Sequence, residues 1–301
     1  MIKYVKNNEI DREKWDHCIS MIPLVKPYGF SWYMDNMAPG WAALIDDDYK
    51  SVFPIPGFKR FGIHYISTPT FLQQLGCFSP DKPPRDALNE FLEYIPEFYR
   101  LIDLCVGHRT DSPDYRITEK PNYELNLSQP YSILYDNFSH HCKRNIERSA
   151  RKKHELTIDV TPGEMIELFI NNRGSEIKGI KARDYKRLQN LMKYCLDLKK
   201  GRIVGVRTKG KKLVYGLFVI EVKGNITLLF VANTQESREG RTGYFVVNEL
   251  IKESAGTSTI LDFEGSSIPT VASFMESFGT VNVPYYRIYR NRLFWPLKMF
   301  R

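Results

Sequence analysis

Two apolar runs in the last third of the 301-residue chain constrain its fold more than any other feature. They cover residues 215–220 and 226–232, and Lys223-Gly224-Asn225 lies between them. Nearly continuous apolar runs are typical of strands buried on both faces, and a short turn containing glycine joins antiparallel neighbours. The sequence therefore predicts two adjacent antiparallel strands inside a sheet.

A polar loop with two glycines follows the second run. It covers residues 233–243, and an amphipathic helix is predicted for residues 244–255. A helix N-terminus presents free N–H groups and a positive dipole end, and glycine lets a ligand approach the backbone closely. The pattern therefore predicts an anion site; the alternative is an ordinary loop with surface arginines. The residues assigned to this site are Arg238, Gly240, Arg241, Thr242 and Gly243.

Two carboxylates lie near the end of the next predicted strand, residues 259–263. Asp262 and Glu264 flank Phe263, so strand alternation would place both on one face and Phe263 on the other. Two carboxylates beside an apolar core can form a general base, because one of the two pKa values is raised. The alternative is structural: Glu264 hydrogen-bonds the following turn and Asp262 caps a neighbouring group.

A basic helix is predicted for residues 138–153. Phe138, Cys142, Ile146 and Ala150 recur every four residues and form an apolar stripe. A second stripe at the same spacing is basic, and it predicts a polyanion-binding face; a solvated helix face is the alternative. The residues assigned to this face are Lys143, Arg144, Arg148 and Lys152.

Aromatic and amide side chains are concentrated in the N-terminal part. Trp32, Tyr33 and Asp35 are close in the sequence, and Gln73 and Gln74 interrupt an apolar run. Aromatic side chains at this density usually belong to a core, yet Tyr and Trp with a polar partner also suit recognition of a sugar or peptide. Buried glutamines must be hydrogen-bonded, either to backbone or to a ligand. All five residues are candidates for binding an acceptor substrate.

Composition excludes several classes of protein. No run approaches the roughly 20 apolar residues of a membrane span, and the first residues lack the apolar segment of a signal peptide, so we expect a cytoplasmic protein. The five cysteines show neither a disulfide framework nor zinc spacing, and no metal is expected. Walker, dinucleotide-binding and Ser-His-Asp patterns are absent. The net charge of +8 favours an anionic partner, with plain solubility as the alternative.

The order of predicted elements suggests two similar α/β halves. The second half is predicted to run strand, helix, helix, three strands, helix, strand, helix, strand, and the first half is a shorter version. We expect an N-terminal domain over residues 1–130 and a C-terminal domain over residues 131–301, which includes the basic linker helix.

This order resembles the acyl-CoA N-acyltransferase (GNAT) fold, with mixed, mostly antiparallel sheets flanked by helices. The tandem arrangement is similar to the FemAB-like branch. Three segments carry the resemblance: the basic residues 145–152, the loop and helix start at residues 237–244, and residues 261–266 with Phe274 and Phe278-Gly279. The usual acetyltransferase loop reads Gln/Arg-x-x-Gly-x-Gly/Ala, whereas the glycines of this loop are shifted.

The resemblance implies transfer of an acyl or aminoacyl group to an amine. The donor would be a coenzyme A thioester such as acetyl-CoA, or an aminoacyl-tRNA, and its phosphates would lie on the loop at residues 238–243. Backbone N–H groups of Phe230, Val231 and Ala232 would polarise the carbonyl, and Asp262 or Glu264 would accept the amine proton. The acceptor, a small molecule or a cell-wall precursor, would lie between the halves. The alternative is a non-catalytic RNA-binding protein on the same fold.

Overall fold

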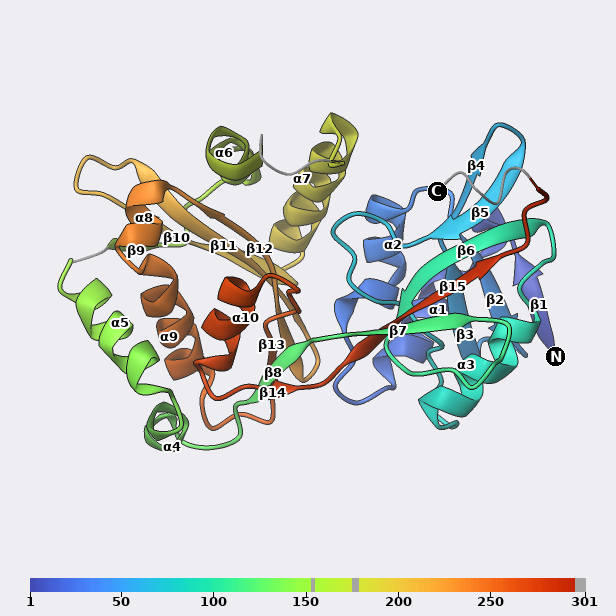
Figure 1. Cartoon of the computed structure of the whole chain (residues 1–301), viewed down its shortest axis with the longest axis horizontal. Coiled ribbons are helices and arrows are strands. Elements are labelled where there is room, and N and C mark those ends of the chain that lie inside the picture. The colour runs from blue at the N-terminus through green and yellow to red at the C-terminus, as the bar shows by residue number, and fades with distance from the viewer. Residues whose placement is uncertain (153–154, 175–178, 296–301) are drawn as a thin grey trace. The chain divides into compact units, whose positions relative to one another are not determined.

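The computed structural model describes residues 1–152, 155–174 and 179–295 (Figure 1). The chain folds into two compact units. Unit 1 contains residues 1–120 together with the segment that begins at Pro284, and unit 2 contains residues 121–283. The basic helix predicted for residues 138–153 ends earlier than expected, at Ala150, and Lys153 lies outside the described residues.

Unit 1 contains a three-stranded sheet of order β1-β2-β3 and a five-stranded sheet of order β4-β5-β6-β15-β7. Within the second sheet β5 and β6 are parallel, and the other neighbours are antiparallel. The elements are β1 (Ile2–Val5), η1 (Asn7–Glu9), α1 (Arg12–Ser20), η2 (Pro27–Gly29), α2 (Ser31–Met37), β2 (Ala42–Asp46), β3 (Ser51–Ile55), β4 (Gly57–Arg60), β5 (Ile63–Ser67), α3 (Pro84–Glu93), β6 (Tyr99–Val106), β7 (Arg116–Lys120) and β15 (Tyr285–Asn291).

The last strand changes the expected division of the chain. Strand β15 pairs with β6 and β7, so the end of the chain belongs to unit 1 and not to a domain covering residues 131–301. The first crossing between units lies at residues 120–121, ten residues before the expected boundary. Sequence patterns could not reveal this return, because the pairing joins residues more than 160 positions apart.

Unit 2 is built on a seven-stranded sheet of order β14-β8-β13-β12-β11-β10-β9. Strands β12 and β13 are parallel, and all other neighbours are antiparallel. The elements are β8 (Tyr123–Asn126), α4 (Tyr131–Asp136), α5 (His140–Ala150), β9 (Glu155–Thr157), α6 (Pro162–Phe169), the π-helical turn η3 (Ile170–Gly174), α7 (Ala182–Asp197), β10 (Gly201–Arg207), β11 (Leu213–Val222), β12 (Asn225–Asn233), α8 (Gln235–Glu239), α9 (Thr242–Ser254), β13 (Ile260–Asp262), α10 (Pro269–Glu276) and β14 (Val281–Asn282).

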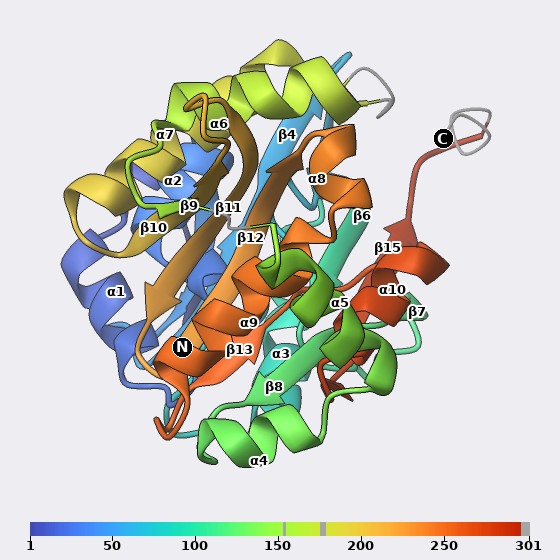
Figure 2. The ribbon, with the colours of Figure 1, turned by 90° about the vertical axis from the view of Figure 1, so that its left-hand side faces the viewer.

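Helices cover both faces of this sheet, as Figures 1 and 2 show. Helices α6 and α7 pack on one face, and α5 and α9 lie side by side on the other. The predicted apolar stripe of α5 is confirmed at Phe138, Cys142 and Ile146, which join the core, whereas Ala150 is exposed. Burial raises the pKa of Cys142 to about 12, so this cysteine is a neutral thiol within the core.

The predicted hairpin of β11 and β12 is confirmed by the structure. The two central strands are buried over most of their length, and Gly224 takes the left-handed φ of 72° that the turn requires. Side chains cap two helices locally: Asp11 accepts hydrogen bonds from the backbone N–H groups of Glu13 and Lys14 at the start of α1. Thr161 and Glu164 form a capping box at the start of α6. Within the described residues no helix is both long and apolar enough for a membrane span.

Candidate functional site

Strands β12 and β13 separate along their length and open a gap in the sheet of unit 2. Their parallel pairing covers three residue pairs and ends at Thr227 and Asp262. Strand β12 continues to Asn233 and pairs only with β11. The register shifts between Phe218 and Val219, which pair with Phe230 and Leu228, so Leu229 is a bulged residue. Bulges are common beside active sites, where they change the direction of a strand.

A cavity of about 550 Å³ lies at this opening, and its lining is mostly apolar with a few charged groups. Its size suits a ligand-binding site. Of the residues that the structure describes, three arginines, Arg173, Arg238 and Arg241, line it together with a single carboxylate, Glu264. The lining is therefore electropositive and fits an anionic ligand better than a cationic one.

The predicted phosphate loop is wrong in its conformation, because residues 235–239 form the short helix α8. Thr234 caps this helix through the N–H of Ser237. The N–H groups of Arg238, Gly240 and Arg241 bond to the carbonyls of Thr234, Glu236 and Arg238. These three N–H groups are consequently unavailable to a pyrophosphate.

Arginine side chains, and not loop N–H groups, supply the positive charge at the cavity. Arg238 donates to the backbone carbonyl and the side-chain Oδ1 of Asn233, at 3.1 and 2.9 Å. Arg241 is exposed and takes a left-handed backbone conformation (φ 61°), in which non-glycine residues are uncommon. Gly243 lines the cavity, whereas Gly240 and Thr242 do not.

Among the three residues predicted to polarise a carbonyl, Val231 is the one that lines the cavity. The N–H of Thr234 bonds to Val214 of β11. Hydrogen bonds in an antiparallel ladder alternate, so the N–H groups of Phe230 and Ala232 also point toward β11, and that of Val231 points to the open edge. Phe230 packs against Phe169 at 4.7 Å between ring centroids.

The two candidate carboxylates lie in different surroundings, contrary to the alternation argument. Strand β13 ends at Asp262, and Glu264 has a left-handed φ of 59°. Asp262 is fully buried, accepts the N–H of Glu264 at 2.9 Å and does not line the cavity. Glu264 and Phe263 both line it. The positive φ breaks the strand period, so only Glu264 is placed to touch a ligand there.

Several lining residues were missed by the sequence patterns. They come from α6, η3, β11, α9, α10 and the segment before α10, and they include Phe169, Arg173, Tyr215, Tyr244, Ser266 and Val271. Of these, Arg173 lies in a π-helical turn, and π-turns are frequent at functional sites. That turn is itself a tertiary feature and has no sequence signature.

The basic stripe of α5 is exposed at Arg144, Arg148 and Lys152, as predicted for a polyanion-binding face. Lys143 differs, because its Nζ bonds to the carbonyl of Asp136 and lies 5.3 Å from the Tyr135 ring centroid. Arg144 contacts His141, whereas neither Arg148 nor Lys152 has a hydrogen bond or ion pair with the described residues. Lys143 therefore has partners within the protein, whereas the cations that follow it along the stripe are exposed to an external ligand.

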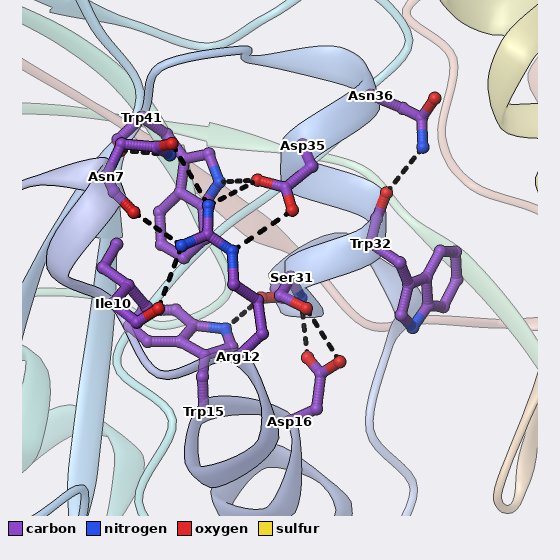
Figure 3. A network of polar contacts seen from close by, with 11 residues as sticks. Asn7, Ile10, Arg12, Trp15, Asp16, Ser31, Trp32, Asp35, Asn36 and Trp41 are labelled. Atoms are coloured by element: carbon purple, nitrogen blue, oxygen red, sulfur yellow. Dashed lines mark hydrogen bonds and ion pairs between the residues drawn. The ribbon is translucent and has the colours of Figure 1, made fainter.

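The aromatic candidates of unit 1 belong mainly to its core. Asp35 accepts from the indole Nε1 of Trp41 at 2.8 Å and pairs with Arg12 at 3.1 Å, as Figure 3 shows. Arg12 also donates to backbone and side-chain oxygens of Asn7. The role of Asp35 in this network is structural, which explains why a carboxylate occurs among so many aromatic rings.

The other unit 1 candidates also have partners inside the protein. Trp32 stacks on Phe30 with centroids 5.6 Å apart, and the fully buried Tyr33 donates its hydroxyl to the carbonyl of Phe71. Gln74 donates to the side-chain oxygen of Gln73 at 2.6 Å. These contacts give the four residues partners within unit 1. An acceptor role for them stays a prediction.

Asp35→Ala is expected to destabilise unit 1 by about 1–3 kcal/mol, because it leaves the buried Nε1 of Trp41 without an acceptor. All four tryptophans lie in unit 1, so their fluorescence during urea unfolding reports this unit alone. Asp48→Ala, which removes an exposed ion pair with Lys14, is the matched control and should change little. Equal unfolding curves for the two variants would contradict the structural role.

Solved structures with the same fold support this description. No protein-family model and no curated protein sequence matches the chain. The structure of FemX aligns over 99% of both chains with a TM-score of 0.67 and 13% identity. L-PGS from Bacillus licheniformis aligns over 86% of this chain and 87% of its own, with a TM-score of 0.53 and 13% identity. A conserved protein from Bacteroides thetaiotaomicron aligns over 96% and 99%, with a TM-score of 0.62 and 12% identity. The chain therefore has the FemAB-like tandem GNAT fold.

Proposed function

We propose that unit 2 transfers an aminoacyl group from an aminoacyl-tRNA to an amine. The observation that carries this proposal is the electropositive cavity where β12 and β13 separate, with Arg241 and Glu264 both held in left-handed conformations at its lining. Such a conformation costs about 1–2 kcal/mol for a non-glycine residue, and strained residues of this kind cluster at active sites. The FemAB-like fold, in which the donor can be an aminoacyl-tRNA, supports the same assignment.

The geometry favours a tRNA ester over a coenzyme A thioester as donor. A coenzyme A loop holds the pyrophosphate with a run of backbone N–H groups, and here the N–H groups of Ser237, Arg238 and Gly240 are used in the hydrogen bonds of α8. An RNA backbone can instead be bound by side chains, and Arg238 and Arg241 line the cavity while α5 carries exposed cations.

The chemical step needs three contributions from this site. The neutral amine nitrogen attacks the ester carbonyl carbon, and the N–H of Val231 stabilises the developing oxyanion. Glu264, as a carboxylate, accepts the proton that the nitrogen loses. The bond between the acyl carbon and the ribose oxygen then breaks, so an amide forms and the tRNA leaves with a free hydroxyl, which receives the proton.

A transfer assay tests the proposal. The full chain is incubated with bulk tRNA charged with radiolabelled amino acids and with a low-molecular-weight amine extract. Mild alkali then hydrolyses the remaining esters, whereas amide products survive. Label in alkali-stable products is the expected result. Transfer from labelled acetyl-CoA alone would overturn the choice of donor, and salt-sensitive RNA binding without any transfer would favour the non-catalytic RNA-binding alternative.

Arg241→Gly is expected to weaken binding of the donor without lowering the stability of the fold. Glycine accepts a positive φ, which offsets the extra conformational entropy of the unfolded glycine chain. The guanidinium of Arg241 has no hydrogen bond or ion pair with the described residues, so its loss removes positive charge from the cavity only. We expect KM for the donor to rise about tenfold while the unfolding midpoint stays within error. A fall in stability together with an unchanged KM would assign Arg241 to the fold.

A further inference from the structure

A second cavity in unit 2, of about 320 Å³, lies at the N-terminal end of α9. It is lined by the end of the basic segment at Lys152, by the connection between β10 and β11 at Arg207 and Lys209, and by Ser237 and Thr242. Within the described ranges, Ser237 alone lines both this cavity and the donor cavity described above. We call it the α9 cavity.

Two buried hydroxyl groups in the α9 cavity lack partners. Ser237 and Thr242 are 3% and 1% exposed, and neither hydroxyl oxygen has a hydrogen bond with the described residues. A buried polar group left unsatisfied costs about 1–3 kcal/mol, so native proteins rarely retain one without a reason. Two such groups in one cavity indicate a polar ligand, to which each hydroxyl can donate a hydrogen bond.

The charges around the α9 cavity identify that ligand as an anion. The charge of Arg207 is already paired, because its Nη2 forms an ion pair with Glu164 at 2.7 Å. Lys152 and Lys209 are exposed and have no such partner in the described part of the chain. A methyl group added at Gly240 would lie 2.8 Å from the Nζ of Lys152, so this ammonium reaches the start of α9. Glu236 is the one carboxylate among the described lining residues, and the first turn of the thirteen-residue α9 adds its N–H groups.

The ligand chemistry that matches these groups is a phosphate. Its oxygens accept from the two hydroxyls and from the lysine ammonium groups at the same time. Lys152 also continues the four-residue spacing of Arg144 and Arg148 along the exposed face of α5, which packs beside α9 (Figure 2). An extended chain of phosphates that follows α5 would therefore reach the α9 cavity at its end.

We propose that the α9 cavity binds one backbone phosphate of the donor RNA, outside the donor cavity, while Arg144 and Arg148 contact the preceding phosphates. This inference rests on the proposed function, since it names a part of the donor that unit 2 holds. Ser237, which lines both cavities, links the bound phosphate to the cavity in which the ester reacts.

The binding test uses the full chain and a short single-stranded RNA with a fluorescent label. Lys152→Gln and Thr242→Val are each expected to raise the Kd about tenfold. Lys152→Gln should also make the dependence of log Kd on log salt concentration shallower by about 0.7, the value for one phosphate contact to a single strand. Lys223→Gln is the matched control, because it removes the same charge from an exposed position at the opposite end of β11 and should leave both quantities unchanged.

A stability measurement separates binding from folding. Thr242→Val removes an unsatisfied buried hydroxyl, so without RNA its unfolding midpoint should equal or exceed that of the unmodified chain. A lower midpoint together with unchanged RNA affinity would give the hydroxyl a structural role and overturn the proposal.

The remaining outcomes show whether the phosphate belongs to RNA or to another molecule. They also separate failure of this phosphate site from failure of the proposed function. Wild-type affinity and salt dependence in both Lys152→Gln and Thr242→Val overturn the RNA contact, even if aminoacyl transfer occurs. Protection of the fold by inorganic phosphate or coenzyme A, abolished by Lys152→Gln, without any RNA binding would overturn RNA as the source. Weakened RNA binding in both variants supports the site, even if no transfer is found and the proposed function fails.

Discussion

Glu264→Gln is expected to lower kcat for aminoacyl transfer by about 10²–10⁴-fold, the usual contribution of a positioned general base. Glutamine preserves the size of the side chain and carries the same backbone preference at φ 59°, but it cannot accept the proton of the amine. Among the described residues, Glu264 is the only carboxylate that lines the donor cavity, so none of the other lining residues can replace it as a base. The measurement is single-turnover transfer from charged tRNA.

Two further variants make the result specific. Glu276→Gln removes a carboxylate of the same unit that does not line the cavity, and its kcat should stay within a factor of two or so of the unmodified value. Asp262→Ala is expected to lower stability by about 1–3 kcal/mol, since Asp262 is fully buried and accepts the N–H of Glu264. If Glu264→Gln retains full kcat, the base lies elsewhere.

Gly265→Ala is expected to destabilise unit 2 by more than about 3 kcal/mol, at or above the upper end of ordinary overpacking. A Cβ at this position would lie 1.7 Å from the carbonyl oxygen of Pro121 and 2.8 Å from its carbonyl carbon. Both neighbours are backbone atoms, which cannot rotate away as a side chain would. The two segments would have to move apart, which breaks the pairing of β8 with the end of β13, where Tyr123 bonds to Phe263 and Glu264.

Far-UV circular dichroism during urea unfolding measures this effect, with Gly163→Ala as the control. Gly163 lies in α6 of the same unit, and a Cβ there would meet its nearest neighbour at an ordinary 3.5 Å. Alanine is the better helix former, so Gly163→Ala should be neutral or stabilising by up to about 1 kcal/mol. Similar unfolding midpoints for the two alanine variants would show that the segment of Gly265 can relax.

The sequence patterns located the region of the site but not its chemistry. The segment at residues 226–266 was selected because a buried strand, a polar segment, a helix and a further strand follow one another there, and the donor cavity lies along those elements. Arg238, Arg241, Gly243 and Glu264, which the sequence assigns to the site, line this cavity. The function of each depended on information that periodicity does not contain.

The segment at residues 233–243 shows why the sequence pattern did not predict the function of these residues. Five-residue helices such as α8 are unstable in isolation, because nucleation costs more than a few hydrogen bonds return, so propensity gives no signal for them. The helix forms because Thr234 caps it and because β12 and α9 fix its two ends. When this helix forms, its own hydrogen bonds use backbone N–H groups that a phosphate loop would offer to a ligand. The spacing of glycines and arginines in the sequence does not predict this use.

Asp35 illustrates the same limit in unit 1. A carboxylate beside two aromatic residues in sequence is compatible with a substrate pocket or with a buried network. The choice depends on Arg12 and Trp41, which the fold brings to its side chain.

By itself, the sequence determined the elements whose causes are local. The continuous apolar runs and Gly224 specify the β11–β12 hairpin, and Asp11 and the Thr161–Glu164 box begin their helices, because each of these signals acts within a few residues. Only the tertiary structure decided that β15 returns to unit 1, that Glu264 leaves the strand period, and that Ser237 and Thr242 share a cavity with Lys152. These features depend on contacts between distant segments, and their energies appear only when the chain has folded.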